Sequence, residues 1–223
     1  MITFDLKFGI GSNNLEFSEE YKSLINNSCE ILIEVINSTE FQNDVLEYKW
    51  QHKRRGYISG FNHTNASRSE VLNKLLSGND KFSDEFNDDH NVINDGDIDI
   101  WIFPYYAKRK IVGSTNPSTY RTWLNLNYWN RRIITNKINP ILTKIEIAEN
   151  ILHEYCHNLG FGHKGNKPHK HYNRHSVPYA LGDIFNKIAL KLNENKTKLM
   201  SDFDFENEFI VDCSFTENKD NVA

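Results

Sequence analysis

The sequence predicts an α+β fold, because apolar residues recur along the chain with two different periods. They occupy every second position from Ile2 to Ile10, which is typical of a strand with one buried face. Residues 19–37 carry them at spacings of three and four, the period of an amphipathic helix that begins after Ser18. A second helical pattern covers residues 144–159. We therefore expect a sheet packed against at least two helices.

Length, charge and cysteine content exclude several classes of protein. The 223 residues suit one domain with a sizeable core. A net charge of -4 without long basic runs gives no footprint for nucleic acid or for an acidic membrane surface. Three cysteines without a CxxC pair indicate neither a disulfide framework nor a thiolate metal cage. No segment has the pattern of a secretory signal or a membrane span, so we expect a cytoplasmic protein, with export by an unseen or trimmed signal as the alternative.

Several shorter elements precede the second long helix. A short strand is expected near Val45–Trp50, and Ser67 with Glu70 forms a capping box that opens a helix ended by Gly78. Residues 80–97 are polar and acidic, which predicts a surface loop that ends in a turn rather than a calcium site. The run Ile98–Phe103 predicts a buried strand.

The second half of the chain alternates extended and helical patterns. Residues 111–129 indicate two extended pieces, broken at Asn116-Pro117. Thr143 and Glu146 form a second capping box, so the next helix is expected to begin near residue 144 and to end at Gly160. A last helix is predicted over 178–193. A strand over 208–215 and a disordered tail of eight residues follow.

The helix over 144–159 has two distinct faces. One is apolar and the other is polar. The apolar face consists of Ile145, Ala148, Leu152, Cys156 and Leu159, with Ile147, Ile151 and Tyr155 beside them. The polar face consists of Glu146, Asn150, His153 and His157.

The end of this helix reads HEYCHNLGFGH and predicts a metal site. His153 and His157 are four residues apart on one helical face, the spacing at which two imidazoles bind one zinc ion. Glu154 lies about 100° around the helix, where it can reach a zinc-bound water without becoming a ligand. Gly160 allows the chain to turn back, so that His163 approaches from another direction. Three imidazoles leave one exchangeable position, which is typical of a catalytic zinc.

These residues resemble the motif HExxHxxGxxH of the metzincin clan of zinc peptidases, which is matched at His153, Glu154, His157, Gly160 and His163. The match covers eleven residues. It implies a twisted mixed β-sheet packed on an N-terminal helix and an active-site helix, with a small C-terminal subdomain that contains a helix. By this resemblance residues 1–160 form the upper part, 161–215 the lower part and 216–223 a disordered tail of a single domain. The segment 111–129 would supply the edge strand of the sheet, against which a peptide substrate pairs.

The chain departs from the family at one turn. Metzincins carry a methionine in a tight turn beneath the metal, downstream of the third histidine. The chain contains only Met1 and Met200. The segment His175–Tyr179 resembles that turn, with Val177 or Pro178 in the place of the methionine.

Other polar residues near the motif have two interpretations each. By the same resemblance Tyr179 stabilises an oxyanion near the metal, whereas the alternative is a packing tyrosine at the start of a helix. His169, His171 and His175 could bind a second metal, but exposed histidines in a basic loop are the favoured interpretation. Cys156 lies on the apolar face of its helix and is interpreted as part of the core rather than as a nucleophile or a redox switch.

The expected function is zinc-dependent hydrolysis of peptide bonds by an endopeptidase. His153, His157 and His163 are the expected Zn²⁺ ligands, and Glu154 and Tyr179 the expected catalytic residues. The expected partner is a protein or peptide substrate, with no nucleic acid and no membrane, and the chain is expected to be a monomer. The alternatives are a zinc-containing peptide-binding module without turnover and a protein whose zinc only stabilises its fold.

Overall fold

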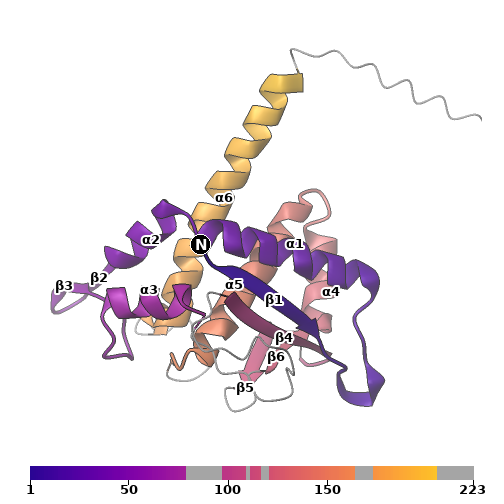
Figure 1. The fold of residues 1–223 in the computed structure, drawn as a ribbon, viewed down its shortest axis with the longest axis horizontal. Coiled ribbons are helices and arrows are strands. Elements are labelled where there is room, and N and C mark those ends of the chain that lie inside the picture. Colours follow the sequence, from indigo (N-terminus) through magenta and orange to yellow (C-terminus); the bar gives the residue numbers. More distant parts are fainter. Residues whose placement is uncertain (79–96, 109–110, 117–120, 164–172, 205–223) are drawn as a thin grey trace, which may run out of the picture. The chain divides into compact units, whose positions relative to one another are not determined.

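The structure is a computed structural model, and the chain divides in it into two compact units, residues 1–190 and residues 191–223. The prediction of a single domain, with boundaries at 160 and 215, stays a prediction. Within the described residues, four strands form a mixed sheet, two more form a hairpin, and there are six α-helices (Figure 1). The predicted α+β class is confirmed. The structure describes residues 1–78, 97–108, 111–116, 121–163 and 173–204.

The mixed sheet has the strand order β1-β4-β6-β5. Strand β1 (Thr3–Phe8) pairs in parallel with β4 (Asp97–Tyr105), and β4 pairs in parallel with β6 (Arg121–Asn125). Strand β5 (Gly113–Asn116) runs antiparallel to β6 and forms one edge of the sheet. The strands predicted at residues 2–10 and 98–103 are therefore confirmed, and an edge strand lies within residues 111–129 as expected.

Two long helices cover one face of this sheet. Helix α1 (Glu19–Ile36) contacts β1, helix α5 (Pro140–Asn158) contacts β5 and β6, and the two helices pack against each other (Figure 1). The Ser18 side chain accepts a hydrogen bond from the backbone N–H of Tyr21 and caps α1 as predicted. The apolar residues expected on α5 are buried, so the core lies between α1, α5 and the sheet.

Helix α5 starts earlier than the sequence indicated, and the predicted capping box at its start is wrong. The helix begins at Pro140, because proline has the fixed φ that suits the first helical position. Thr143 lies inside the helix, is buried, and accepts a hydrogen bond from Asn136 Nδ2 at 3.1 Å. The Glu146 carboxylate pairs instead with Arg132 of the preceding helix. This tertiary ion pair competed successfully with the local cap.

A helix, a hairpin and a second helix connect α1 to the sheet. Helix α2 (Thr39–Leu46) occupies part of the stretch predicted as a strand, and the strand β2 (Lys49–His52) begins only after it. The predicted strand is thus found, but its start was placed too early, because Ser38 caps α2, and Phe41 and Val45 pack into the core at helical spacing. Helix α3 follows, with the predicted capping box formed by Ser67 and Glu70. Strand β3 spans Gly56–Ser59 and helix α3 spans Arg68–Leu76. A 3₁₀ turn at Ser12–Asn14 lies before α1, between β1 and that helix.

The second extended piece predicted over residues 111–129 is too long, because helix α4 (Leu126–Thr135) begins inside it. Buried Asn125 ends β6 and caps α4 by accepting a hydrogen bond from the N–H of Asn127 at 3.1 Å. Its amide nitrogen also donates to the carbonyl of Ile111 at 2.6 Å. One side chain therefore joins the end of β6, the start of α4 and the segment that leads into β5.

The last described element is helix α6 (Val177–Asp204), preceded by a 3₁₀ turn at Asn173–His175. The helix starts one residue before the predicted position and runs eleven residues past the predicted end at residue 193. The part of α6 in the first unit is buried at Ala180, Phe185 and Ile188, among others. Among the described residues, no helix combines the length and the apolar character that crossing a bilayer requires. Of the loop predicted at 80–97, Asp97 is the first residue of β4 and the rest lies outside the described residues. The predicted strand at 208–215 and the tail at 216–223 also lie outside them.

Candidate metal centre

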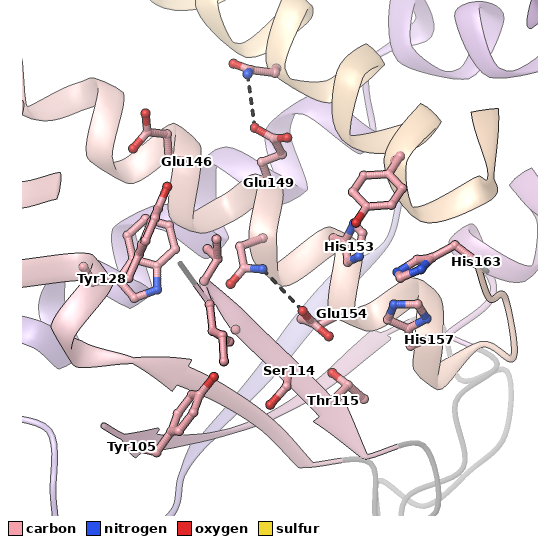
Figure 2. A pocket seen from close by; sticks show the side chains of 17 residues that line it. Tyr105, Ser114, Thr115, Tyr128, Glu146, Glu149, His153, Glu154, His157 and His163 are labelled. Carbon is pink, nitrogen blue, oxygen red and sulfur yellow. Dashed lines mark hydrogen bonds between the residues drawn. The ribbon is translucent and has the colours of Figure 1, made fainter. Parts of the chain in front are cut away.

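The polar face of α5 lines a cavity of about 750 Å³. Strand β5 lies on the opposite side of this cavity, and α6 contributes Tyr179 and Asn186 to its wall (Figure 2). From α5 the cavity receives Glu146, Glu149, Asn150, His153, Glu154 and His157. The four residues that the sequence placed on the polar face all line it. The helix therefore presents its apolar face to the core and its polar face to a space that can hold a ligand.

The structure brings the three predicted histidines together at one end of this cavity. One ring nitrogen from each of His153, His157 and His163 lies within 4.8 Å of the others. The ring centroids are 4.9 to 5.4 Å apart, and Figure 2 shows the three rings facing one another. A tetrahedral ion with nitrogens at about 2 Å needs a separation of roughly 3.3 Å, which small rotations of the side chains supply. The donor set therefore fits a metal ion.

Gly160 produces the turn that allows this arrangement. Its φ is +86°, in the left-handed region that glycine adopts without steric cost. The Gly160 N–H donates to the carbonyl of His157 at 3.0 Å, and the Phe161 N–H donates to the carbonyl of Cys156 at 2.9 Å. These bonds satisfy carbonyls at the end of the helix while the chain reverses toward His163. The role that the sequence predicted for Gly160 is confirmed.

Two of the histidine rings are oriented by backbone carbonyls. The Nδ1 atom of His157 lies 2.8 Å from the carbonyl oxygen of Phe161, and the ring of His153 hydrogen-bonds the carbonyl of Pro178. A carbonyl accepts a proton from one ring nitrogen and so leaves the other as a free acceptor, the arrangement of metal-binding histidines. Burial lowers the pKa of both rings, that of His153 to about 3 with help from the neighbouring histidines. Both rings are therefore neutral and ready to bind a cation.

Glu154 lies beside the histidines with its carboxylate turned into the cavity (Figure 2). Burial raises the pKa of this carboxyl to about 7, and hydrogen bonds from Thr115 and Asn150 oppose the rise. The Asn150 Nδ2 atom is 3.5 Å from the carboxylate. A buried carboxyl with a pKa near neutrality can both accept and release a proton. Glu154 therefore lies next to the three histidines and outside their cluster, while its catalytic role stays a prediction.

Strand β5 approaches the helix closely at Gly113. A Cβ there would lie 2.5 Å from the Asn150 amide oxygen and 3.0 Å from the carbonyl oxygen of Trp123, so a larger residue would require the Asn150 side chain to shift. The N–H of Asn125 bonds the carbonyl of Val112, which makes these two residues a hydrogen-bonded pair. Because antiparallel pairs alternate, the backbone groups of Gly113 and Thr115 point away from β6. Within the described part of the chain, this edge of β5 pairs with no further strand, and it lies next to the cavity.

Tyr179 also lies at the histidine cluster. Its ring centroid is 4.6 Å from that of His153 and 4.9 Å from that of His163. Burial and the Glu154 carboxyl raise the pKa of the phenol, which therefore stays protonated and able to donate a hydrogen bond. The structure thus places Tyr179 in the site, while its role stays a prediction.

The turn before Tyr179 is tied to the β2–β3 hairpin. The ring of His175 stacks on Trp50, with centroids 4.3 Å apart, and its Nδ1 atom is 2.9 Å from the hydroxyl of Tyr48. His175 is therefore a packed residue and not an exposed one, which corrects the favoured interpretation for this histidine. His169 and His171 lie outside the described residues. Cys156 is fully buried, which confirms its place in the core.

Sequence reasoning missed several residues of the cavity. Glu149 precedes His153 by one helical turn, so the same spacing argument that found the histidines could have found it. Asn186 of α6 and Tyr105 of β4 also line the cavity. No sequence signal near the motif indicates either, because they approach through the packing of distant elements.

Searches with protein-family models, curated proteins and solved structures found no match to this chain. The functional argument therefore rests on the geometry of the site. The resemblance to metzincins rests on the five motif residues in the sequence.

Proposed function

We propose that the protein is a zinc-dependent endopeptidase of the metzincin type. One observation carries the proposal: a helix and the turn after it bring three histidines and a buried glutamate together in a cavity beside the edge strand β5 of the described sheet. The order of sheet, active-site helix and later helix is consistent with the fold that the resemblance implies. Each part of the site has a task in the cleavage of a peptide bond.

The three histidines would hold the metal. The neutral rings of His153 and His157, each bonded to a backbone carbonyl, suit zinc, which takes nitrogen ligands in a four-coordinate site. When bound, zinc supplies Lewis-acid chemistry, which lowers the pKa of a coordinated water and polarises a carbonyl group. Among the described residues, the cluster contains three ligands, so one position is left for the reaction.

Glu154 acts as the general base and then as the general acid. Its carboxylate takes a proton from the attacking water, and it later gives this proton to the departing amine. A pKa near 7 suits both transfers at neutral pH, because the driving forces in the two directions are then similar. The amides and hydroxyls that contact Glu154 hold the carboxylate in place between the two steps.

The edge of β5 binds the backbone of the substrate, and Tyr179 assists the reaction. An extended peptide adds to an open strand edge through main-chain hydrogen bonds, which require no particular sequence. The outward backbone groups of Gly113 and Thr115 offer such bonds directly opposite the polar face of α5. The protonated phenol of Tyr179 donates a hydrogen bond to the negative charge that develops on the carbonyl oxygen.

The test compares wild type with Glu154→Gln. We expect about one zinc per chain in both proteins by elemental analysis, because Glu154 is not a ligand. Cleavage of a peptide library, read by mass spectrometry, should fall by about 10² to 10⁴ in the variant, the range for loss of a general base. Exposed Glu30→Gln serves as the matched control and should cleave as wild type does.

Each result has a distinct meaning. Undiminished cleavage by Glu154→Gln would remove Glu154 from the mechanism. Zinc in both proteins without cleavage by either would favour the peptide-binding module. Absence of zinc from wild type, even after incubation with the metal, would contradict the proposal as a whole.

A further inference from the structure

The cavity continues beyond the histidines along α5, toward Glu149 and Glu146 (Figure 2). Glu149 lies one helical turn before His153, about 6 Å along the helix axis. A single long side chain spans this distance. A substrate held at the histidines therefore places one of its neighbouring side chains within reach of Glu149.

The charges of this end of the cavity are unbalanced. Among the lining residues that the structure describes, three are glutamates and none is a lysine or an arginine. Glu146 is neutralised by Arg132, whose Nε donates to its carboxylate at 2.6 Å. Glu149 has only the neutral amide of Asn186, at 3.1 Å, and no ion pair within the described part of the chain. Two glutamates three residues apart on one helix thus differ in their counter-charge.

The surroundings of Glu149 make a cation especially favourable there. Helix α6 packs directly on this side chain, because a Cβ at Gly182 would lie 3.3 Å from its Cγ and Oε1 atoms. Burial and the charge of Asp183 raise the pKa of Glu149 to about 7. A buried acid beside another acid is stabilised by a positive partner. The buried Oδ1 of Asn150, on the same wall, also has no hydrogen-bond donor among the described residues.

We propose that Glu149 is a specificity-determining residue, which receives a lysine or arginine side chain of the substrate next to the cleaved bond. The inference rests on the proposed peptidase function and names the class of peptide that it selects. A cationic side chain supplies the missing charge to Glu149, and its N–H groups can donate to the Glu149 carboxylate and to the Asn150 Oδ1. Peptides with an acidic or apolar side chain at this position leave the Glu149 carboxyl without a counter-charge.

The first experiment profiles cleavage. Wild type and Glu149→Gln, both loaded with zinc, digest a peptide library, and the residues around each cleaved bond are counted. Wild type should prefer lysine and arginine over norleucine at one fixed position by at least about tenfold. Glu149→Gln keeps the shape and the bond to Asn186, so it should lose this preference and still cleave peptides with norleucine. Glu30→Gln is the control and should keep the wild-type preference.

The second experiment measures binding without turnover. Two fluorescent peptide pools, with lysine or norleucine at a central position between randomised residues, are titrated into zinc-loaded Glu154→Gln and into the Glu154→Gln/Glu149→Gln double variant. The lysine pool should bind at least about tenfold more tightly to the first protein and equally well to the second. Melting temperatures and zinc content of both proteins show that fold and metal are retained.

The outcomes separate this inference from the proposed function. Cleavage without preference for lysine or arginine, or with a preference that survives in Glu149→Gln, overturns the inference and leaves the peptidase standing. Lysine-selective binding that depends on Glu149, without any cleavage, supports the inference and contradicts the peptidase. Equal binding of both pools by Glu154→Gln, or no binding at all, overturns the inference.

Discussion

The two faces of α5 perform different tasks, although they belong to the same nineteen residues. The apolar face is buried against α1 and the sheet, where Ile145, Ala148 and Leu152 are at most 1% exposed. The polar face lines a cavity and carries groups that attract cations. The first face stabilises the fold by burial, and the second keeps polar groups away from water at a cost in free energy.

The difference between the two faces shows how the candidate metal centre depends on the hydrophobic core. Buried imidazoles and carboxyls destabilise the fold when nothing binds them, so the apolar face has to compensate for them. In return, the rigid packing of that face holds the polar groups at a fixed spacing. Substitutions on the two faces should therefore have opposite consequences for stability and for ligand binding.

The largest expected effect is on metal binding, from His157→Ala. Loss of one of three ligands should lower the affinity for zinc by more than about 100-fold, since changes outside the ligand group alone cost about 10- to 100-fold. Isothermal titration of the metal-free protein with zinc measures this effect. His52→Ala, on β2 and outside the cluster, is the control and should bind zinc as wild type does. Equal affinities of His157→Ala and wild type would contradict the site.

The next effect is on stability, from Leu152→Ala on the apolar face. Leu152 is fully buried, so its truncation should lower the free energy of unfolding by about 2 to 5 kcal/mol. Urea unfolding of the metal-free protein measures the change. Leu190→Ala removes a leucine that is 37% exposed and should cost much less. A loss below about 1 kcal/mol for Leu152→Ala would show that this face contributes little to the core.

The smallest effect is on the pH dependence of stability, from Glu149→Gln. Burial and Asp183 raise the pKa of Glu149 from 4.5 to about 7 in the folded protein. The folded state then binds a proton that the unfolded state releases, so the contribution is full below pH 4.5 and is lost as the pH rises through 7. Glu149→Gln should remove this part of the decline, at most about 3 kcal/mol.

Urea unfolding of both metal-free proteins at about pH 4.5 and pH 7.5 tests this expectation. The difference between the proteins isolates Glu149, because Glu154 and Asp183 are present in both. An identical change of stability with pH in wild type and Glu149→Gln would mean that the surroundings do not raise the pKa of the Glu149 carboxyl in the folded protein. The two faces of α5 would then differ less in energetic terms than the structure indicates.

Most of the predicted elements are found where the chemistry is local. A hydroxyl or carboxylate that caps a helix acts over three or four residues, so the starts of α1 and α3 could be predicted from Ser18, Ser67 and Glu70. The polar face of α5 and the left-handed turn at Gly160 could be predicted for the same reason. The predicted boundaries were wrong at α2, α4 and the start of α5. At these places a local sequence signal competed with tertiary packing, or the helix cap had no clear signal in the sequence.

The sequence by itself determined the spacing of His153, Glu154, His157 and His163, because one helix and one glycine turn place them. Only the tertiary structure decided what surrounds these residues. The open edge of β5, the Tyr179 ring and the Asn186 amide reach the cavity from elements far apart in the chain. Their positions depend on the packing of whole helices and strands, whereas the motif depends only on the regular rise and rotation of one helix.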